Sequence, residues 1–130
     1  MKQFSLLIMV TGLLILVGIG LRVPNPIFWE SLEVTVTAYN STPNQTDGTP
    51  FMAAWGNRLT PGIKSVAVSR DLLDLGLGNG KELYITGFDG PYVVLDKMNK
   101  RFKRRIDLYF GMDVKKAQKF GKRTATIYWR

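Results

Sequence analysis

Short runs in which apolar and polar residues alternate recur along the chain after residue 30. The stretch Glu33–Asn40 (EVTVTAYN) alternates in this way and is rich in β-branched residues, which is typical of a half-buried strand. Further short runs, bounded by turn-forming residues, also predict strands. These are Ser65–Ser69, Glu82–Thr86, Tyr92–Leu95, Ile106–Phe110 and Thr124–Trp129. A mainly β chain with six short strands favours a closed or nearly closed barrel over a doubly wound sheet.

Two short helices and one long loop are predicted between these strands. Arg70–Leu75 is expected to form one helical turn, and Val114–Phe120 a short helix. Asp113 is placed to cap the second helix and Gly121 to end it, because aspartate favours N-caps and glycine favours the position after a helix. The stretch Ser41–Pro61 is rich in Thr, Pro, Asn and Gly and predicts a long loop, a feature that is more often functional than not.

The first residues of the chain follow a different pattern. Phe4–Leu21 carries no charge, and as a helix it would span roughly 27 Å, enough for the hydrocarbon core of a membrane. Lys2 precedes this run, but no A-x-A-like cleavage site follows it, so an uncleaved anchor is favoured over a cleaved signal peptide. Residues 1–22 are therefore expected to be a signal anchor or signal peptide, with a hydrophobic helix in the inner membrane. In either case the remainder is exported and faces the periplasm or cell wall.

A single domain is expected after this segment. Pro24 and Pro26 stop a helix and begin a linker, expected over residues 23–32. The chain has 130 residues, which leaves room for one domain, here residues 33–130.

The composition narrows the chemistry that this domain can perform. The chain contains no Cys and no His, which excludes disulfide frameworks, thiol catalysis, Ser-His-Asp triads and nearly all catalytic zinc sites. Proton transfer then falls to carboxylates, Lys or Tyr, and we expect no metal or other cofactor. The 18 Lys and Arg residues against 10 Asp and Glu give a net charge of +8. Such a charge attracts polyanions, but it is also compatible with simple solubility.

Two aspartates stand in segments that are otherwise apolar. Asp96 follows the run Tyr92–Leu95, and Asp107 lies inside the strand predicted at Ile106–Phe110. Aspartate is depleted in strands, and an ionised carboxylate is costly in an apolar environment unless it is paired or functional. If the two strands lie side by side, both carboxylates reach one face, and their repulsion raises one pKa enough for a general acid. The alternative is a salt bridge from each aspartate to the basic residues between them. These are Lys97, Lys100, Arg101, Lys103, Arg104 and Arg105.

The order of several motifs resembles that of the 3D (three-aspartate) domain. The most specific element is an aspartate eleven residues before the aspartate of an R-I-D-x-Y-F segment, which Asp96 and Asp107 match. The other matching motifs are Thr37-Ala38-Tyr39, Val66-Ala67-Val68, Leu83-Tyr84-Ile85 and Ala117 followed by Phe120–Arg123. The resemblance covers about Val34 to Trp129. This module is shared by membrane-bound lytic transglycosylase A and the muralytic stationary-phase survival proteins of spore formers, and rare lipoprotein A is similar more distantly.

The resemblance implies a six-stranded double-psi β-barrel that cleaves peptidoglycan glycan strands. Asp107 matches the catalytic acid/base of the family, and the aspartate that Asp96 matches lies beside it in the same groove. In the implied mechanism, protonated Asp107 donates to the glycosidic oxygen between N-acetylmuramic acid and N-acetylglucosamine. Its carboxylate then takes the proton of the muramyl C6 hydroxyl, which closes a 1,6-anhydro ring. Asp96 would raise the pKa of Asp107, whereas Arg104 and Arg105 would lower it.

Other residues are candidates for substrate contacts. Thr37 and Tyr39, near the end of the first predicted strand, are placed to contact sugar, and Trp55 in the long loop to stack on a sugar face. Packing is the alternative role for Tyr39 and Trp55. Arg105, with the rest of the basic run, would face acidic groups of the substrate or envelope.

The chain departs from the family pattern at two places. The family commonly has a Gly-Gly loop after the first aspartate of the pair, whereas residues 97–102 are basic and bulky here. The third family aspartate corresponds to Ser69, and the nearest acid, Asp71, either replaces it at the substrate or caps the following helical turn. These departures favour an alternative function, a non-catalytic peptidoglycan-binding or envelope-tethering module. Nucleic acid is not an expected partner, because only Phe102 interrupts the basic run.

Overall fold

A computed structural model describes residues 29–42 and 51–130 of the chain. The hydrophobic N-terminal segment and residues 43–50 of the predicted long loop lie outside the described residues, so the expected N-terminal helix is not part of this description. Within the described ranges, no helix has both the length and the apolar character needed to cross a membrane.

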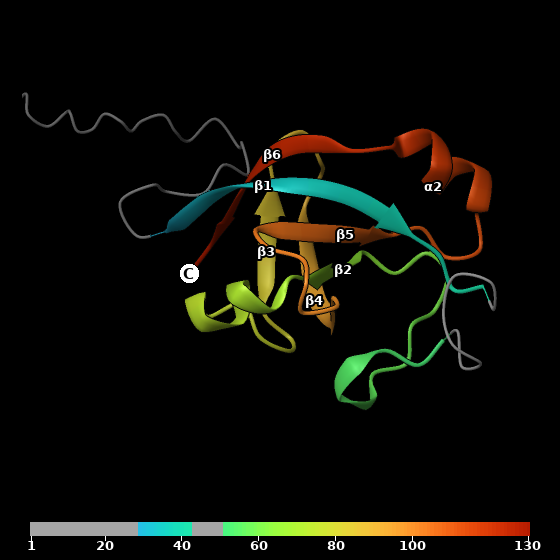
Figure 1. Ribbon diagram of the computed structural model, residues 1–130, viewed down its shortest axis with the longest axis horizontal. Helices are drawn as coiled ribbons and strands as arrows, with labels where there is room; N and C mark the ends of the chain where they lie inside the picture. The colour runs from blue at the N-terminus through green and yellow to red at the C-terminus, as the bar shows by residue number, and fades with distance from the viewer. Residues whose placement is uncertain (1–28, 43–50) are drawn as a thin grey trace, which may run out of the picture.

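Six strands form a closed barrel, as the alternating segments of the sequence predicted (Figure 1). The strands are β1 (Glu30–Tyr39), β2 (Ser65–Val68), β3 (Glu82–Ile85), β4 (Pro91–Lys97), β5 (Arg105–Tyr109) and β6 (Arg123–Trp129). Around the barrel their order is β1-β5-β2-β4-β3-β6. The pairs β1–β5 and β2–β4 are parallel, and the other four pairs are antiparallel. This mixed, closed arrangement is compatible with a double-psi β-barrel.

Among the residues that the structure describes, three short helical segments connect the strands. They are η3 (Ala54–Gly56), η4 (Arg70–Leu75) and α2 (Val114–Phe120). The predicted cap of α2 is confirmed, because Asp113 Oδ1 accepts a hydrogen bond of 2.9 Å from the backbone N–H of Lys116. The strand boundaries differ from the prediction by up to three residues, and the largest difference is that β1 begins at Glu30, inside the segment expected to be a linker. The added residues extend the antiparallel pairing of β1 with β6, in which Glu30 lies opposite Trp129.

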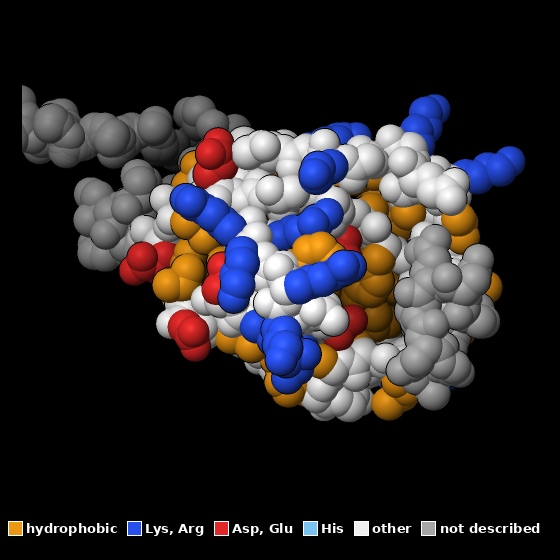
Figure 2. All heavy atoms as spheres, viewed as in Figure 1, with side chains coloured by type: hydrophobic (Ala, Val, Ile, Leu, Met, Phe, Trp, Pro, Cys, Tyr) orange, Lys and Arg blue, Asp and Glu red, His pale blue; other side chains and the backbone are white. Residues whose placement is uncertain are grey.

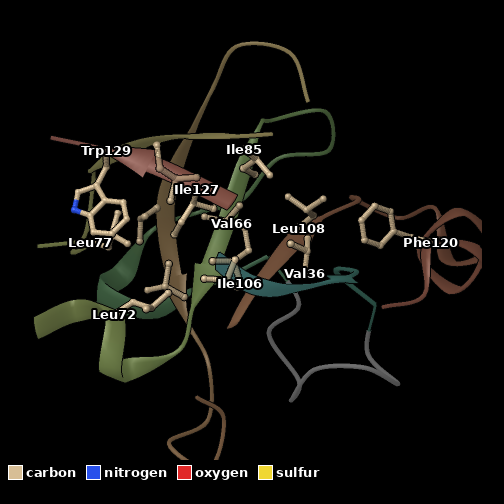
Figure 3. Close-up of a cluster of buried hydrophobic side chains, with 14 residues drawn as sticks. Val36, Val66, Leu72, Leu77, Ile85, Ile106, Leu108, Phe120, Ile127 and Trp129 are labelled. Atoms are coloured by element: carbon tan, nitrogen blue, oxygen red, sulfur yellow. The ribbon is translucent and has the colours of Figure 1, made fainter. Parts of the chain in front are cut away.

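The apolar residues of the alternating strands point into the barrel and form its core (Figure 3). Each strand contributes at least one side chain to this cluster, which includes Val36, Val66, Val94, Ile106, Leu108 and Ile127. Leu72, Leu77 and Trp129 close one end of the cluster, and Phe120 lies at the other (Figure 3). The indole Nε1 of Trp129 donates a hydrogen bond of 3.1 Å to the carbonyl oxygen of Leu75, so its one polar atom is satisfied.

A bulge in β4 changes which face its last residues present. Val66 of β2 lies opposite Val94, but the next residue, Ala67, lies opposite Asp96, so Leu95 is the extra residue. Without this shift, the strict alternation of a strand would place Leu95 opposite Ala67 and turn Asp96 toward the core side. The carbonyl oxygen of Leu95 accepts a hydrogen bond of 2.8 Å from the Asn57 amide. The bulge therefore aims Asp96 away from the core.

Leu77 and Leu75 provide a direct test of this core. Leu77 is fully buried, whereas Leu75 is about half exposed two residues earlier. We expect Leu77→Ala to lower the free energy of unfolding by about 3 kcal/mol, because the truncation leaves a cavity. Leu75→Ala should change it by less than about 1 kcal/mol. Urea unfolding of the two variants measures both values, and equal losses would contradict this assignment of the core.

Candidate functional site

One row of residues crosses four adjacent strands on the outer face of the barrel. Thr37 of β1 lies opposite Asp107 of β5, and Asp107 lies opposite Ala67 of β2. Ala67 in turn lies opposite Asp96 of β4. Residues that are paired across strands project to the same side of a sheet, and the neighbours of Ala67 along β2 are core residues. Thr37, Asp107, Ala67 and Asp96 therefore share the face that points away from the core.

The two predicted acidic residues do come to one face, but their strands are not neighbours. The expectation that the strands of Asp96 and Asp107 lie side by side is wrong, because β2 runs between them. Two strand spacings separate the two Cα atoms, which is about 10 Å. The residue between them is Ala67, whose side chain is only a methyl group and is buried. Figure 2 shows a hollow on the face viewed, lined by hydrophobic side chains and with acidic side chains at two points of its edge.

Asp107 has an environment that favours its protonated form. Burial raises the pKa of its carboxyl above the ordinary value, and the negative charge of Asp96 adds to this effect. Two contacts act in the opposite direction without cancelling it. Thr37 Oγ1 donates a hydrogen bond of 2.8 Å to Asp107 Oδ1, and the guanidinium of Arg105 lowers the pKa through its charge. Arg105 Nε in turn donates to Thr37 Oγ1 at 3.3 Å.

Asp96 is held in place by three hydrogen bonds from uncharged donors. The backbone N–H groups of Ala54 and Lys97 each donate to Oδ1 at 2.9 Å, and the hydroxyl of Tyr39 donates to Oδ2 at 3.2 Å. These contacts, together with the Thr37 bond to Asp107, do not support the alternative in which each aspartate forms a salt bridge with the basic residues between them. The donors to the pair are hydroxyls and backbone amides, whereas the nearby guanidinium of Arg105 bonds to Thr37.

The negative charges of both Asp96 and Asp107 act on Tyr39. Burial raises the pKa of its phenol strongly, and the charges of Asp96 and Asp107 raise it further. Its ring packs against that of Tyr109, with centroids 5.5 Å apart, and the hydroxyl of Tyr109 accepts a hydrogen bond of 2.7 Å from Ser41. Tyr39 thus keeps its proton and acts as a hydrogen-bond donor at neutral pH. Of the two roles that the sequence left open, packing is confirmed by the contact with Tyr109, and the contact with sugar stays a prediction.

Trp55 lies in η3, the segment that covers Asp96. Its side chain is 40% exposed, and its backbone has a φ of 58°, in the left-handed region that non-glycine residues rarely adopt. The ammonium group of Lys97 lies 5.3 Å from the centre of its ring system. An exposed aromatic ring thus lies next to the residue whose N–H holds Asp96, and packing in the core is not its role.

Asp71 does not join the other two aspartates. Its Oδ2 accepts a hydrogen bond of 2.9 Å from the backbone N–H of Arg104, where the chain enters β5. Partial burial raises the pKa of Asp71, but hydrogen bonds from Ser69 and from the Arg104 backbone, among other effects, outweigh it, so the net shift is downward. The substrate-binding role assigned to Asp71 therefore has no support from its contacts. The predicted cap of η4 is absent too, since Ser69 occupies the N-cap position without a side-chain cap.

The basic residues of the β4–β5 connection form one side of the site. Figure 2 shows Lys and Arg side chains gathered on this face, over the region where Figure 1 places β5 and that connection. Phe102 contacts two of them, because the guanidinium carbons of Arg101 and Arg105 lie 4.5 and 4.7 Å from its ring centroid. The ring that interrupts the basic run is therefore already occupied by cations of the same chain.

A separate surface pocket opens beyond Tyr109. It has a volume of about 280 Å³, contains neither Asp96 nor Asp107, and is lined by Gly62, Ile63, Lys64, Tyr92, Tyr109, Phe110, Asp113 and Lys116. In the part of the chain that the structure describes, no three Asp or Glu side chains gather closely enough to hold a metal ion.

Several features of the site have no signal in the sequence. The N–H of Ala54 comes from a loop 42 residues before Asp96, and nothing in the residue type marks it as a partner. Ala67 matches the family motif, but its place between the two carboxylates depends on the order of the strands. Ser69 occupies the position at which the family has its third aspartate. Its Oγ accepts a hydrogen bond of 2.9 Å from the backbone N–H of Arg105.

Comparison with known proteins gives no further assignment. No protein-family model matches the chain, and no curated protein matches it.

The hydrogen bond from Thr37 provides a test of the acidity of Asp107. Thr37→Val removes the donor and leaves an apolar surface, so we expect the pKa of Asp107 to rise further. Carbon-13 NMR of the side-chain carboxyl across a pH series measures the midpoint. Thr124→Val is the matched control, since Thr124 is an exposed strand threonine on β6. A midpoint that is unchanged in Thr37→Val would contradict the role of this bond.

The stability of Asp107→Asn provides a second test. A raised pKa means that the folded protein keeps this proton to a higher pH than the unfolded chain, whose ordinary value is 3.8. Ionisation of Asp107 therefore opposes folding; this cost is fully present above the folded pKa and fades as the pH falls from there to the unfolded value of 3.8. We expect Asp107→Asn to gain stability relative to the wild type between about pH 4 and about pH 7. Urea unfolding at both pH values measures this, and a relative loss at the higher pH would contradict it.

Proposed function

We propose that this protein cleaves the glycan strands of peptidoglycan in the manner of a lytic transglycosylase, with Asp107 as general acid and base. The observation that carries the proposal is the raised pKa of Asp107 on an outer face that it shares with Asp96. A carboxyl whose pKa is raised keeps its proton to a higher pH than usual and can donate it to a leaving group. The resemblance to the 3D domain gives the substrate class, and we propose a divergent member of that family with a double-psi β-barrel.

The proposed reaction uses one carboxyl for two proton transfers. Thr37 donates to Asp107 Oδ1, so we assign the transferable proton to Oδ2. This proton passes to the glycosidic oxygen as its bond to the muramyl C1 breaks, and N-acetylglucosamine leaves with a free hydroxyl. The muramyl C6 oxygen then bonds to C1, and its proton returns to Asp107, which completes the 1,6-anhydro ring. Because no water enters the reaction, a second carboxyl that activates water is not needed.

Neighbouring residues have supporting roles in this proposal. The charge of Asp96 favours the protonated form of Asp107, and three hydrogen bonds fix Asp96 in its position. Trp55, exposed beside it, would stack on a sugar face, and Thr37 and Tyr39 would fix the orientation of the two carboxylates. We propose that residues 1–22 anchor or export the chain, so that the barrel meets peptidoglycan outside the inner membrane.

Analysis of the digestion products tests this function. Purified full-length protein is incubated with peptidoglycan sacculi, and the released fragments are identified by mass spectrometry. We expect anhydro-muropeptides from the wild type and a loss of at least about a hundredfold in Asp107→Asn, because removal of a general acid costs two to four orders of magnitude. Asp74→Asn, an exposed residue of η4, is the matched control and should retain the activity.

The alternative function is a non-catalytic peptidoglycan-binding module. It is favoured by the bulky basic connection beside the site, where Arg101 and Arg105 both contact the Phe102 ring. The same experiment separates the two functions. Protein that sediments with sacculi but releases no fragments would support the binding module, and hydrated rather than anhydro products would contradict the transglycosylase mechanism.

A further inference from the structure

The turn that leads into β5 contains a strained residue. Arg104, immediately before β5, has a φ of 51°, in the left-handed region. A side chain in this conformation brings Cβ too close to the neighbouring backbone, so only glycine adopts it without cost. Such strain persists where the surrounding contacts hold the residue in place, and it often occurs next to functional sites. Asp107 follows three residues later.

Contacts from two other parts of the chain hold this turn. Asp71 Oδ2 accepts the backbone N–H of Arg104 at 2.9 Å, and Ser69 Oγ accepts that of Arg105 at 2.9 Å. From β1, the N–H of Thr35 donates to the Arg104 carbonyl oxygen at 3.0 Å. The Arg104 side chain reaches the same strand, where its Nε donates to the Glu33 carbonyl oxygen at 2.9 Å. Of the two side chains that accept backbone N–H groups of this turn, Asp71 is the charged one, and charge-assisted hydrogen bonds are the stronger ones.

The residue after this turn, Arg105, reaches the site with its side chain. Its Nε donates to Thr37 Oγ1 at 3.3 Å, and Thr37 Oγ1 donates to Asp107 Oδ1 at 2.8 Å. Its guanidinium carbon lies 4.7 Å from the ring centroid of Phe102. Because the backbone of Arg105 is set by the turn at Arg104, a change in that turn would move the guanidinium relative to Thr37 and Asp107.

We infer that Asp71 is a positioning residue, which holds the left-handed turn at Arg104 and so aims Arg105 at the hydrogen bond between Thr37 and Asp107. Through this contact, Asp71 sets the proton affinity of Asp107 without touching it. The consequence for catalysis rests on the function proposed above, whereas the effect on Asp107 does not. In this role Asp71 supports the site through the backbone of Arg104 and does not bind substrate itself.

The electrostatic surroundings of Asp107 predict the direction of the effect. Of the described residues, Arg105 on its own strand, Asp96 on β4 and Tyr39 on β1 are the titratable groups that act on it, and the adjacent β2 contributes the uncharged Ala67. Arg105 is the cation among them. A guanidinium that is no longer held at Thr37 stabilises the carboxylate less, so the titration of Asp107 would move to higher pH.

Two variants of Asp71 separate its hydrogen bond from its charge. The Asp107 carboxyl is titrated in the full-length protein by carbon-13 NMR, with the resonance assigned from Asp107→Asn. We expect Asp71→Ala to shift the midpoint to higher pH, by part of the shift seen in Arg105→Gln. Asp71→Asn keeps an oxygen that accepts the Arg104 N–H, so its midpoint should stay at the wild-type value or move to lower pH. Asp74→Ala, an exposed residue in the same 3-10 helix, should have no effect.

Arg104→Gly tests the strained turn itself. Glycine adopts the left-handed conformation freely, so the double variant Asp71→Ala with Arg104→Gly should titrate like Arg104→Gly alone. The same comparison decides the matter if Asp71→Ala fails to fold. Equal shifts in Asp71→Ala and Asp71→Asn, no shift in folded Asp71→Ala, or an Asp71→Ala shift that persists in the glycine background would each overturn the inference. The titration does not depend on enzymatic activity, so its failure is distinct from a failure of the proposed function.

Discussion

The carboxylates of Asp96 and Asp107 lie on one face because β4 has one residue more than β2 opposite the position of Leu95. The extra residue is held from outside the sheet, where the amide of Asn57 bonds to its carbonyl oxygen and to Asn79 Oδ1. Asn57 belongs to the same loop as Ala54, whose N–H binds Asp96. One loop thus stabilises both the bulge and the carboxylate that the bulge aims. If this loop moved, Asp96 would lose a hydrogen-bond donor, and the backbone that turns it outward would lose its support.

Opposing influences meet at Asp107. Burial and the charge of Asp96 favour the neutral carboxyl, whereas Thr37 and Arg105 favour the ionised one. A general acid must regain the proton that it gives away, so a pKa held by opposing contributions suits the chemistry better than one driven far in a single direction. The contributions come from β1, β4 and β5, and β1 is distant in sequence from the other two strands. The barrel supplies this balance because its closure fixes all three strands relative to one another.

The sequence predicted the elements well, since their signals are local. Alternation in Glu33–Asn40 reflects the burial of every second residue of β1, and Asp113 caps α2 through a contact three residues away. Local signals could not predict how the strands pair. The position of β2 between β4 and β5 depends on packing across the whole barrel. The bulge at Leu95 was equally invisible, since it arises from a mismatch in register and not from a glycine or proline. Asp71 shows the same limit: its partner, Arg104, is 33 residues away and is bound through its backbone, which any residue type provides.

The first residue of β1 and the penultimate residue of the chain lie opposite each other, since Glu30 pairs with Trp129. The chain therefore enters and leaves the barrel at neighbouring positions (Figure 1). A unit built in this way can be spliced into a loop of another protein without stretching either connection. Duplication and insertion within larger multidomain chains are thus geometrically open to this fold.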